Sequence, residues 1–188
     1  QSLAQALRFA PEVERVSSPD EAKAALTVVC EGRQSSSRSQ FGAGWTVKPY
    51  DQKAVAARLQ SERPHGGVAR QWFGQGQVLA LLPLGGADGS SLALVWSVPV
   101  ARAEALQTMS PAELTAALYQ VCGDEVGPLT LISPVASWPL NLSSAGRWVG
   151  PGWALAGDAA HTVHPMAGQG LNLGLADANT LAGVLQGR

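Results

Sequence analysis

The chain has 188 residues, of which 46% are hydrophobic and 14% charged, a composition typical of a folded globular protein. Lys and Arg number 13 against 14 Asp and Glu, so the formal charge of -1 gives no reason to expect a nucleic-acid partner. No run of about 18 apolar residues indicates a membrane-spanning helix. The two cysteines, Cys30 and Cys122, lack metal-binding spacing and indicate a reducing compartment.

The first half of the chain predicts an antiparallel sheet. Residues 20–30 end in a short β-branched run, interpreted as a strand, and a polar loop rich in Ser and Gly follows at 31–44. Segments with β character come next, separated by loops rich in Gly, at 53–62, 67–74, 77–84 and 91–99. Strands at this spacing favour antiparallel pairing.

The second half predicts two helices with strands between them. Ser110 can cap a helix in which Pro111 suits the first position and Glu113 completes a capping box. Residues 129–142 predict further β structure, and residues 152–157 predict a short buried strand. A second helix begins close to Gly168, because apolar residues then recur at helical spacing, at 171, 175, 178, 182 and 185.

The segment between the buried strand and the last helix concentrates polar residues and glycines. A strand that turns into a helix presents free N–H groups at the positive end of the helix dipole, which suits an anionic or electron-rich oxygen. Asp158, at the end of the strand, is placed to accept hydrogen bonds from sugar-like hydroxyls. These residues suggest a cofactor with a polyol arm and an electron-poor ring.

Other interpretations of this segment stay open. The Gly-Asp pair on its own makes an ordinary turn and helix cap. A dinucleotide-binding loop would use Gly168, Gly170 and Gly174. Their spacing differs from that fingerprint, and no strand directly precedes them. A metal site would use Asp158, His161 and His164.

Taken together, the segment resembles the second flavin-binding motif of the aromatic-ring hydroxylases, the single-component FAD monooxygenases related to p-hydroxybenzoate hydroxylase. The matching residues are Gly157, Asp158, Ala159, Ala160, His161, Pro165, Gly168, Gln169, Gly170, Leu171, Asn172 and Asp177. The resemblance implies that Asp158 holds the ribityl chain of FAD and that the start of the last helix, residues 168–172, faces the pyrimidine edge of the flavin. It also implies that Pro165 lies beside the ring where oxygen is activated, as the candidate catalytic residue.

An earlier stretch resembles the Asp-Gly motif of the same family, which is linked with both FAD and NAD(P)H. Cys30, Glu31 and Gly32, followed by Ser35 and Arg38, match this motif. The resemblance therefore adds Glu31, Gly32 and Arg38 to the cofactor-binding candidates. Glu31 stands where the family has Asp, and its extra methylene shifts the carboxylate by roughly a bond length. By itself this piece also fits a polar loop that ends a strand.

The middle of the chain is most similar to the ubiquinone-biosynthesis hydroxylases within that family. The resemblance there rests on the string Glu62, Arg63, Pro64, His65 and on the apolar run 81–84. The implied fold is α+β, with a mainly antiparallel substrate-binding sheet, a covering helix and part of an α/β FAD-binding domain. We expect a partial FAD-domain segment at 1–40, the substrate sheet at 41–145, and an FAD-domain strand and helix at 146–188.

The family begins with an ADP-binding strand, a Gly-rich loop and a helix, and nothing similar precedes Gln1. We therefore expect the chain to be a piece of a longer enzyme that by itself binds FAD weakly or not at all.

The resemblance implies a monooxygenase in which NAD(P)H reduces FAD, the reduced flavin takes up O2 as a C4a-hydroperoxide, and one oxygen passes to a phenol. The implied substrate is a polyprenylphenol against the sheet, where Trp72 and Trp96 could line the site, although such residues are more often core. A cytoplasmic location is implied, with association at the inner face of the membrane or with a biosynthetic complex. Two alternatives remain: a module that binds a lipid or aromatic ligand without flavin, and a hydroxylase of the same fold acting on another aromatic.

Overall fold

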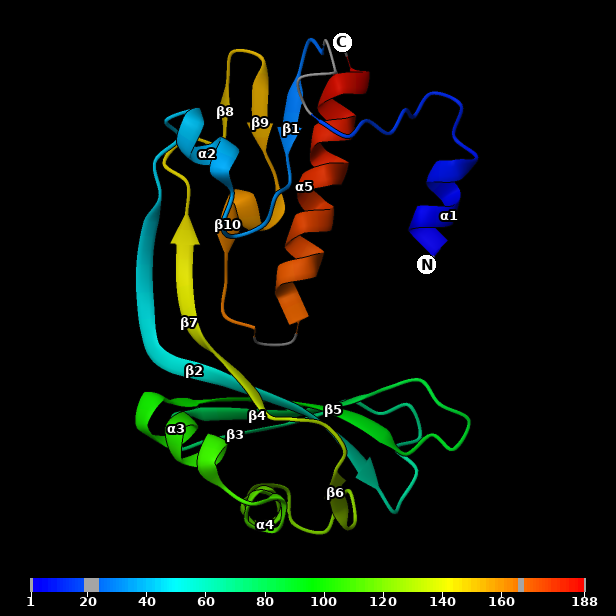
Figure 1. The fold of residues 1–188 in the computed structure, drawn as a ribbon, viewed down its shortest axis with the longest axis vertical. Helices are drawn as coiled ribbons and strands as arrows, with labels where there is room; N and C mark the ends of the chain where they lie inside the picture. Colours follow the sequence, from blue (N-terminus) through cyan, green and yellow to red (C-terminus); the bar gives the residue numbers. More distant parts are fainter. Residues whose placement is uncertain (1, 19–23, 166–167, 188) are drawn as a thin grey trace.

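Two sheets, joined by two long strands, organise the chain (Figure 1). This computed structural model describes residues 2–18, 24–165 and 168–187. Within that part of the chain, the larger sheet is antiparallel and has the order β10-β7-β2-β5-β4-β3, with β6 paired to β2. Its strands are β2 (Thr46–Ser61), β3 (Arg70–Gly74), β4 (Gln77–Pro83), β5 (Ser91–Pro99), β6 (Leu129–Leu131), β7 (Ala136–Ser144) and β10 (His161–Thr162).

The main core lies between the larger sheet and two helices, α3 (Val100–Thr108) and α4 (Pro111–Cys122), which lie below the sheet in Figure 1. Alternate residues along each strand face this layer, so Val55, Leu79 and Trp96 are fully buried there. Leu118 of α4 is fully buried from the helix side. One face of the sheet is thus closed by helices, and the other face points toward the smaller sheet and α5.

Helix α4 begins as the sequence predicts. Ser110 accepts a hydrogen bond from the Glu113 backbone N–H, and the Glu113 carboxylate accepts one from the Ser110 N–H in return. The sequence predicted a single covering helix, and the structure has a second one, α3. It follows β5 directly and has Pro99 as an N-cap without a side-chain hydrogen bond, so the usual polar start signal is missing.

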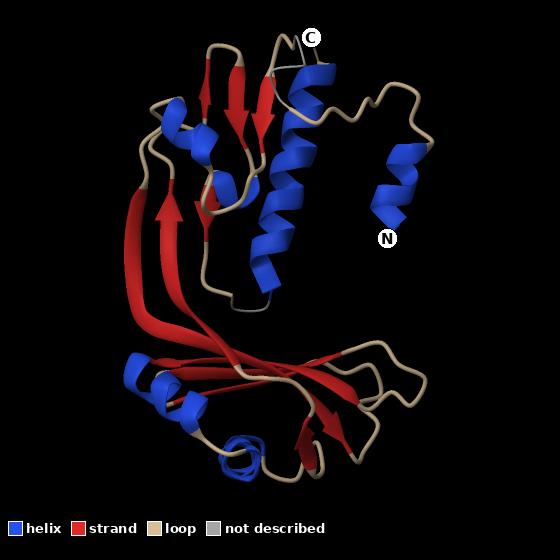
Figure 2. Ribbon diagram, in the orientation of Figure 1, coloured by secondary structure: helices blue, strands red, loops and turns tan. Residues whose placement is uncertain are grey.

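The smaller sheet has the order β1-β9-β8 and is mixed (Figure 2). Its strands are β1 (Thr27–Val29), β8 (Val149–Gly150) and β9 (Trp153–Leu155). β1 runs parallel to β9, whereas β8 is antiparallel to β9. A second buried cluster gathers here, in which Phe41 stacks on Trp153 with ring centroids 5.0 Å apart. The start of the predicted first strand, residues 20–23, lies outside the described residues.

Helix α2 (Ser36–Gln40), the 3-10 turn η2 (Gly157–Ala159) and helix α5 (Gln169–Gln186) lie near the smaller sheet, whereas helix α1 (Ser2–Arg8) lies apart from it (Figure 1). Helix α5 starts where the sequence predicts, but none of its described residues is buried. Leu171 and Leu175, on its apolar face, are 74% and 56% exposed. No described helix is long and apolar enough to cross a lipid bilayer.

The predicted α+β class with a mainly antiparallel sheet is confirmed, and two local predictions are wrong. Residues 36–40 form α2 inside the predicted polar loop, because Ser35 caps the helix by accepting from the Arg38 N–H. β2 begins at Thr46, well before residue 53, because its first residues pair with the end of β7. The Pro and Asp residues in that stretch hide its strand character.

Burial predicts how the same substitution acts at two sites. Leu118→Ala should lower the free energy of unfolding by about 2 to 5 kcal/mol, because it leaves a cavity in the main core. Leu175→Ala, on the exposed face of α5, should change it by less than about 0.5 kcal/mol. Urea denaturation followed by circular dichroism measures both, and losses of similar size would contradict this packing.

Candidate functional site

The two sequence motifs lie side by side at the ends of neighbouring parallel strands. Val29 of β1 pairs with Leu155 of β9, and the Ala156 N–H donates to the Val29 carbonyl at 3.0 Å. The Glu31-Gly32 loop and the Gly157-Asp158 turn therefore leave the sheet at the same edge. In α/β sheets, ligands bind at the carboxyl ends of parallel strands.

The Arg38 side chain joins the two motifs. One terminal nitrogen donates to the Ala159 carbonyl at 3.1 Å, and the other donates to the Arg33 carbonyl at 2.9 Å. The guanidinium lies 3.7 Å from the centre of the Trp45 ring, and the residue is buried. Arg38 was predicted as a cofactor contact, and the structure shows that its hydrogen bonds hold the two loops together.

The Glu31 carboxylate is engaged by its own loop. It accepts from the Ser35 hydroxyl at 2.8 Å, the Ser37 N–H at 3.1 Å and the Ser37 hydroxyl at 2.6 Å. These hydrogen bonds, those from Ser37 first, hold the pKa of Glu31 below its ordinary value. Gly32 follows with a φ of +77°, which turns the chain toward α2. The longer Glu31 side chain thus places its carboxylate against Ser35 and Ser37 at the start of α2.

The Gly157-Asp158 turn leaves a carboxylate free. Gly157 has a φ of +60°, and the Ala160 N–H donates to its carbonyl at 2.8 Å. The Asp158 side chain is exposed and makes no hydrogen bond to any described residue. It lines a hollow of about 160 Å³ together with Arg33, Trp138 and Pro165. An unengaged carboxylate beside Pro165 is available to accept hydrogen bonds from the hydroxyls of a ligand.

Asp177 holds α5 against this turn, a role that sequence reasoning did not assign. Its Oδ2 atom accepts from the Gly157 N–H at 2.8 Å and from His161 Nε2 at 2.7 Å. The His161 ring stacks on Trp148 with centroids 4.8 Å apart. The helix packs closely on the turn here, since a Cβ at Gly174 would lie 3.4 Å from the Gly157 Cα. Asp177 belongs to the quoted motif, but no spacing rule predicts that a helix residue returns to a turn 20 residues earlier.

The start of α5 offers free backbone donors. Gly168 is its N-cap in the left-handed conformation, with a φ of +65° and no side-chain cap, and the first turn contains no acidic residue. Gln169, Leu171 and Asn172 are exposed and Gly170 is half-buried. The first N–H groups of a helix lack intrahelical acceptors, so this end can bind an electron-rich oxygen.

The metal-site interpretation is wrong for the described residues. His161 Nε2 pairs with Asp177, whereas His164 Nε2 lies 3.1 Å from the Gln52 side-chain oxygen. Within the described parts of the chain, no group of three His, Cys, Asp or Glu residues is arranged to hold a metal ion. The structure thus directs the three candidate ligands to separate surroundings.

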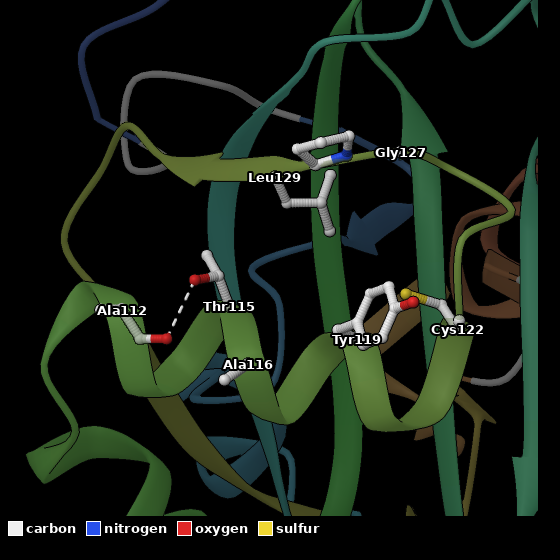
Figure 3. Close-up of a pocket in the computed structure, with 9 residues that line it drawn as sticks. Ala112, Thr115, Ala116, Tyr119, Cys122, Gly127 and Leu129 are labelled. Atoms are coloured by element: carbon white, nitrogen blue, oxygen red, sulfur yellow. Dashed lines mark hydrogen bonds between the residues drawn. The ribbon is translucent and has the colours of Figure 1, made fainter.

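A larger hollow lies elsewhere and contains no motif residue. It measures about 280 Å³ and lies between α4 and the segment 127–129, with Tyr119 and Cys122 at one end (Figure 3). Cys122 is buried and donates to the Leu118 carbonyl at 3.1 Å. Burial raises the pKa of the Cys122 thiol, which makes it a poor nucleophile.

Comparison with known proteins agrees with the geometry. Residues 10–187 match the family described as FAD binding domain. The chain belongs to this family. It is 36% identical over 160 residues to the ubiquinone hydroxylase UbiL of Rhodospirillum rubrum, covering 85% of this chain and 37% of UbiL. It is also 36% identical over 163 residues to the 3-demethoxyubiquinol 3-hydroxylase of Escherichia coli, covering 87% of this chain and 41% of that protein.

The chain therefore spans about two fifths of the length of these FAD-binding relatives. Among solved structures, it is similar to PqsL of Pseudomonas aeruginosa, a probable FAD-dependent monooxygenase. The TM-score is 0.70 at 25% identity, covering 86% of this chain and 46% of PqsL. The predicted resemblance to FAD-dependent hydroxylases of ubiquinone biosynthesis is confirmed at the level of family.

Removal of the Arg38 guanidinium should be costly for stability. Arg38→Ala should lower the free energy of unfolding by about 3 to 5 kcal/mol, because two carbonyls lose charged donors. Arg63→Ala is the matched control, since its ion pair with Asp124 at 2.9 Å is exposed and worth less than about 1 kcal/mol. Chemical denaturation measures both values, and equal losses would argue against Arg38 as the link between the motifs.

The half-buried His164 ring makes stability depend on pH. Burial lowers the pKa of His164 below its ordinary value of 6.5. The unfolded chain then binds a proton more readily, so the free energy of unfolding falls as the pH drops below 6.5. His164→Gln should flatten this decline while keeping an amide donor for Gln52. Denaturation midpoints at pH values on both sides of 6.5 measure the effect, and an unchanged decline would contradict it.

Proposed function

We propose that this chain is part of a flavoprotein monooxygenase that hydroxylates a phenolic ring, with a polyprenylphenol of ubiquinone biosynthesis as substrate. The observation that carries the proposal is the pairing of β1 with β9, which brings both flavin-type motifs together around an unengaged Asp158 carboxylate. Support also comes from two relatives whose names state ubiquinone or ubiquinol hydroxylation. The match to the FAD binding domain favours this function over a flavin-free binding module.

In this proposal, the chain binds FAD through two sets of groups. The Asp158 carboxylate accepts hydrogen bonds from ribityl hydroxyls, and the Gly157 turn lets the cofactor approach the backbone. The first N–H groups of α5, at residues 169–171, donate to the oxygens of the pyrimidine edge. Glu31, Gly32 and Arg38 maintain the neighbouring loop, and Pro165 lies beside the ring. Bound FAD supplies the redox chemistry, with NAD(P)H as reductant and O2 as oxidant.

The sheet face opposite α3 and α4 is the proposed substrate surface. The cross-strand registers place Val78, Ser97 and Ala54 in one row, which ends at Phe73 on one side and Trp138 on the other. Ala54 and Ser97 in the middle of the row are buried, whereas the Phe73 and Trp138 rings at its ends are exposed and can contact an aromatic ligand. Trp138 also lines the hollow with Asp158 and Pro165, so it connects this surface to the flavin motif.

The tryptophans considered from the sequence do not form this surface. Trp96 is fully buried in the core against the helices, where its ring N–H donates to the Gln77 side chain at 3.0 Å. Trp72 packs against the same cluster. Trp96 is therefore a core residue, whereas the half-buried Trp72 also lines a hollow with Phe73 and Gln120.

In this proposal, different parts of the chain bind the cofactor and the substrate. Residues 1–40 and 146–188 form parts of the FAD-binding region, and residues 41–145 form the substrate-binding region. The enzyme would work in the cytoplasm, at the inner face of the membrane or in a biosynthetic complex, because a prenylated phenol partitions into lipid. A hydroxylase of another aromatic would use the same surfaces.

Asp158→Ala tests the proposal. The loss of a charged acceptor for ribityl hydroxyls should weaken FAD binding about 10- to 100-fold, since each such hydrogen bond is worth about 1.5 to 3 kcal/mol. Asp124→Ala removes a carboxylate from an exposed ion pair far from the motifs and should leave the affinity unchanged. Flavin fluorescence during titration measures the dissociation constants. Because this chain is expected to bind FAD weakly by itself, the titration extends to high FAD concentrations, and equal affinity for all three proteins would contradict the proposal.

A further inference from the structure

A bulge in β2 lies between the proposed substrate surface and the flavin motif. The pairing of β2 with β7 shifts between Pro49 and Lys53, and Asp51 adopts a φ of +55°, which is uncommon for a residue with a side chain. Figure 1 shows β2 bending from the larger sheet toward the smaller one. Gln52, which follows Asp51, pairs with Pro99 of β5 as β2 enters the larger sheet.

The Gln52 side chain bridges two segments that are distant in the sequence. Its Nε2 atom donates to the Gly76 carbonyl in the β3–β4 turn at 2.7 Å. Its Oε1 atom lies 3.1 Å from Nε2 of His164, the residue before Pro165. Gln75, the residue before Gly76, has a φ of +49°. The hydrogen bond between Gln52 and Gly76 therefore joins two residues that each follow a residue in an uncommon backbone conformation.

The chemistry of these contacts determines the protonation of His164. A carbonyl oxygen only accepts, so the Gln52 group at Gly76 must be its NH2, and the group at His164 must be its oxygen. His164 therefore donates through Nε2–H. The Tyr50 ring packs edge-on against the imidazole with centroids 5.1 Å apart. The amide of Gln52 thus fixes both the position and the tautomer of His164.

We infer that Gln52 is a positioning residue that sets the separation between the loop carrying Pro165 and the aromatic-binding face of the sheet. The inference rests on the proposed function for its catalytic meaning, because it assumes FAD beside Pro165 and a phenol on the sheet. Oxygen transfer between two rings depends on their separation, and a misplacement of about 1 Å can cost about 100-fold in rate. A single side chain that contacts both the hairpin and the loop fixes that separation.

Three variants of the 188-residue chain separate the two hydrogen bonds. Gln52→Ala removes both. Gln52→Glu keeps an acceptor for His164 but has no donor for the Gly76 carbonyl. Gln60→Ala is the matched control, because it lies on the same strand and its side chain bonds Asp88 and Ser90 instead.

Hydrogen exchange measured by mass spectrometry reports on both contacts without bound cofactor. Gln52→Ala should speed exchange about tenfold at residues 161–164 and in the turn around Gly76, which corresponds to about 1.4 kcal/mol. Gln52→Glu should speed exchange only in the turn, and Gln60→Ala at neither place. Unchanged exchange at 161–164 in Gln52→Ala, or equal acceleration in Gln60→Ala, would overturn the inference.

A second measurement, with FAD bound, tests whether Gln52 positions the substrate relative to the flavin. A short-chain prenylphenol that lies against the flavin should perturb the visible flavin spectrum, and Gln52→Ala should reduce this perturbation while changing FAD affinity less than about twofold. An equal perturbation in both proteins would overturn a positioning role. A chain that takes up no FAD would agree with the weak binding expected of a piece of a longer enzyme, and the exchange data would then decide the role of Gln52 alone.

Discussion

The candidate site depends on the parallel contact between β1 and β9, secured by the buried Arg38 guanidinium. Strands this short provide few hydrogen bonds of their own, and the two motifs are more than 100 residues apart in the chain. Arg38 adds two charged hydrogen bonds and a contact with the Trp45 ring. Its planar geometry suits this role, because a lysine ammonium would not form the same fork. The strand pairing sets where the Glu31 loop and the Asp158 turn leave the sheet, and Arg38 holds the two loops together beyond that edge.

The acidic residues around the site differ in the number of hydrogen bonds that their carboxylates already accept. The Glu31 carboxylate binds three donors in its own loop, and Oδ2 of Asp177 binds two donors that hold α5. Asp158 binds none among the described residues and lines a hollow with Pro165. This contrast assigns framework roles to the first two and leaves Asp158 for a ligand. A buried or fully paired group has little capacity left for a cofactor.

Sequence patterns were informative where one local rule decided the outcome. The capping box of α4, the start of α5 near Gly168 and the alternation that buries Trp96 follow from residue types at fixed spacings. Helix α3 and the early part of β2 were missed, because tertiary pairing overrides their weak local signals. The same limit explains Asp177 and Gln52. Their side chains form hydrogen bonds with partners that no period of 2 or 3.6 residues brings together.

The groups that are free to bind a cofactor all belong to the second motif. The Glu31 loop offers no free carboxylate, whereas Asp158 supplies an acceptor and the start of α5 supplies backbone donors. The most direct test of the account is a crystal structure of this chain soaked with FAD. The account predicts ribityl hydroxyls within hydrogen-bond distance of the Asp158 carboxylate and the pyrimidine edge at the first N–H groups of α5. Flavin bound elsewhere, with Asp158 facing only solvent, would contradict it.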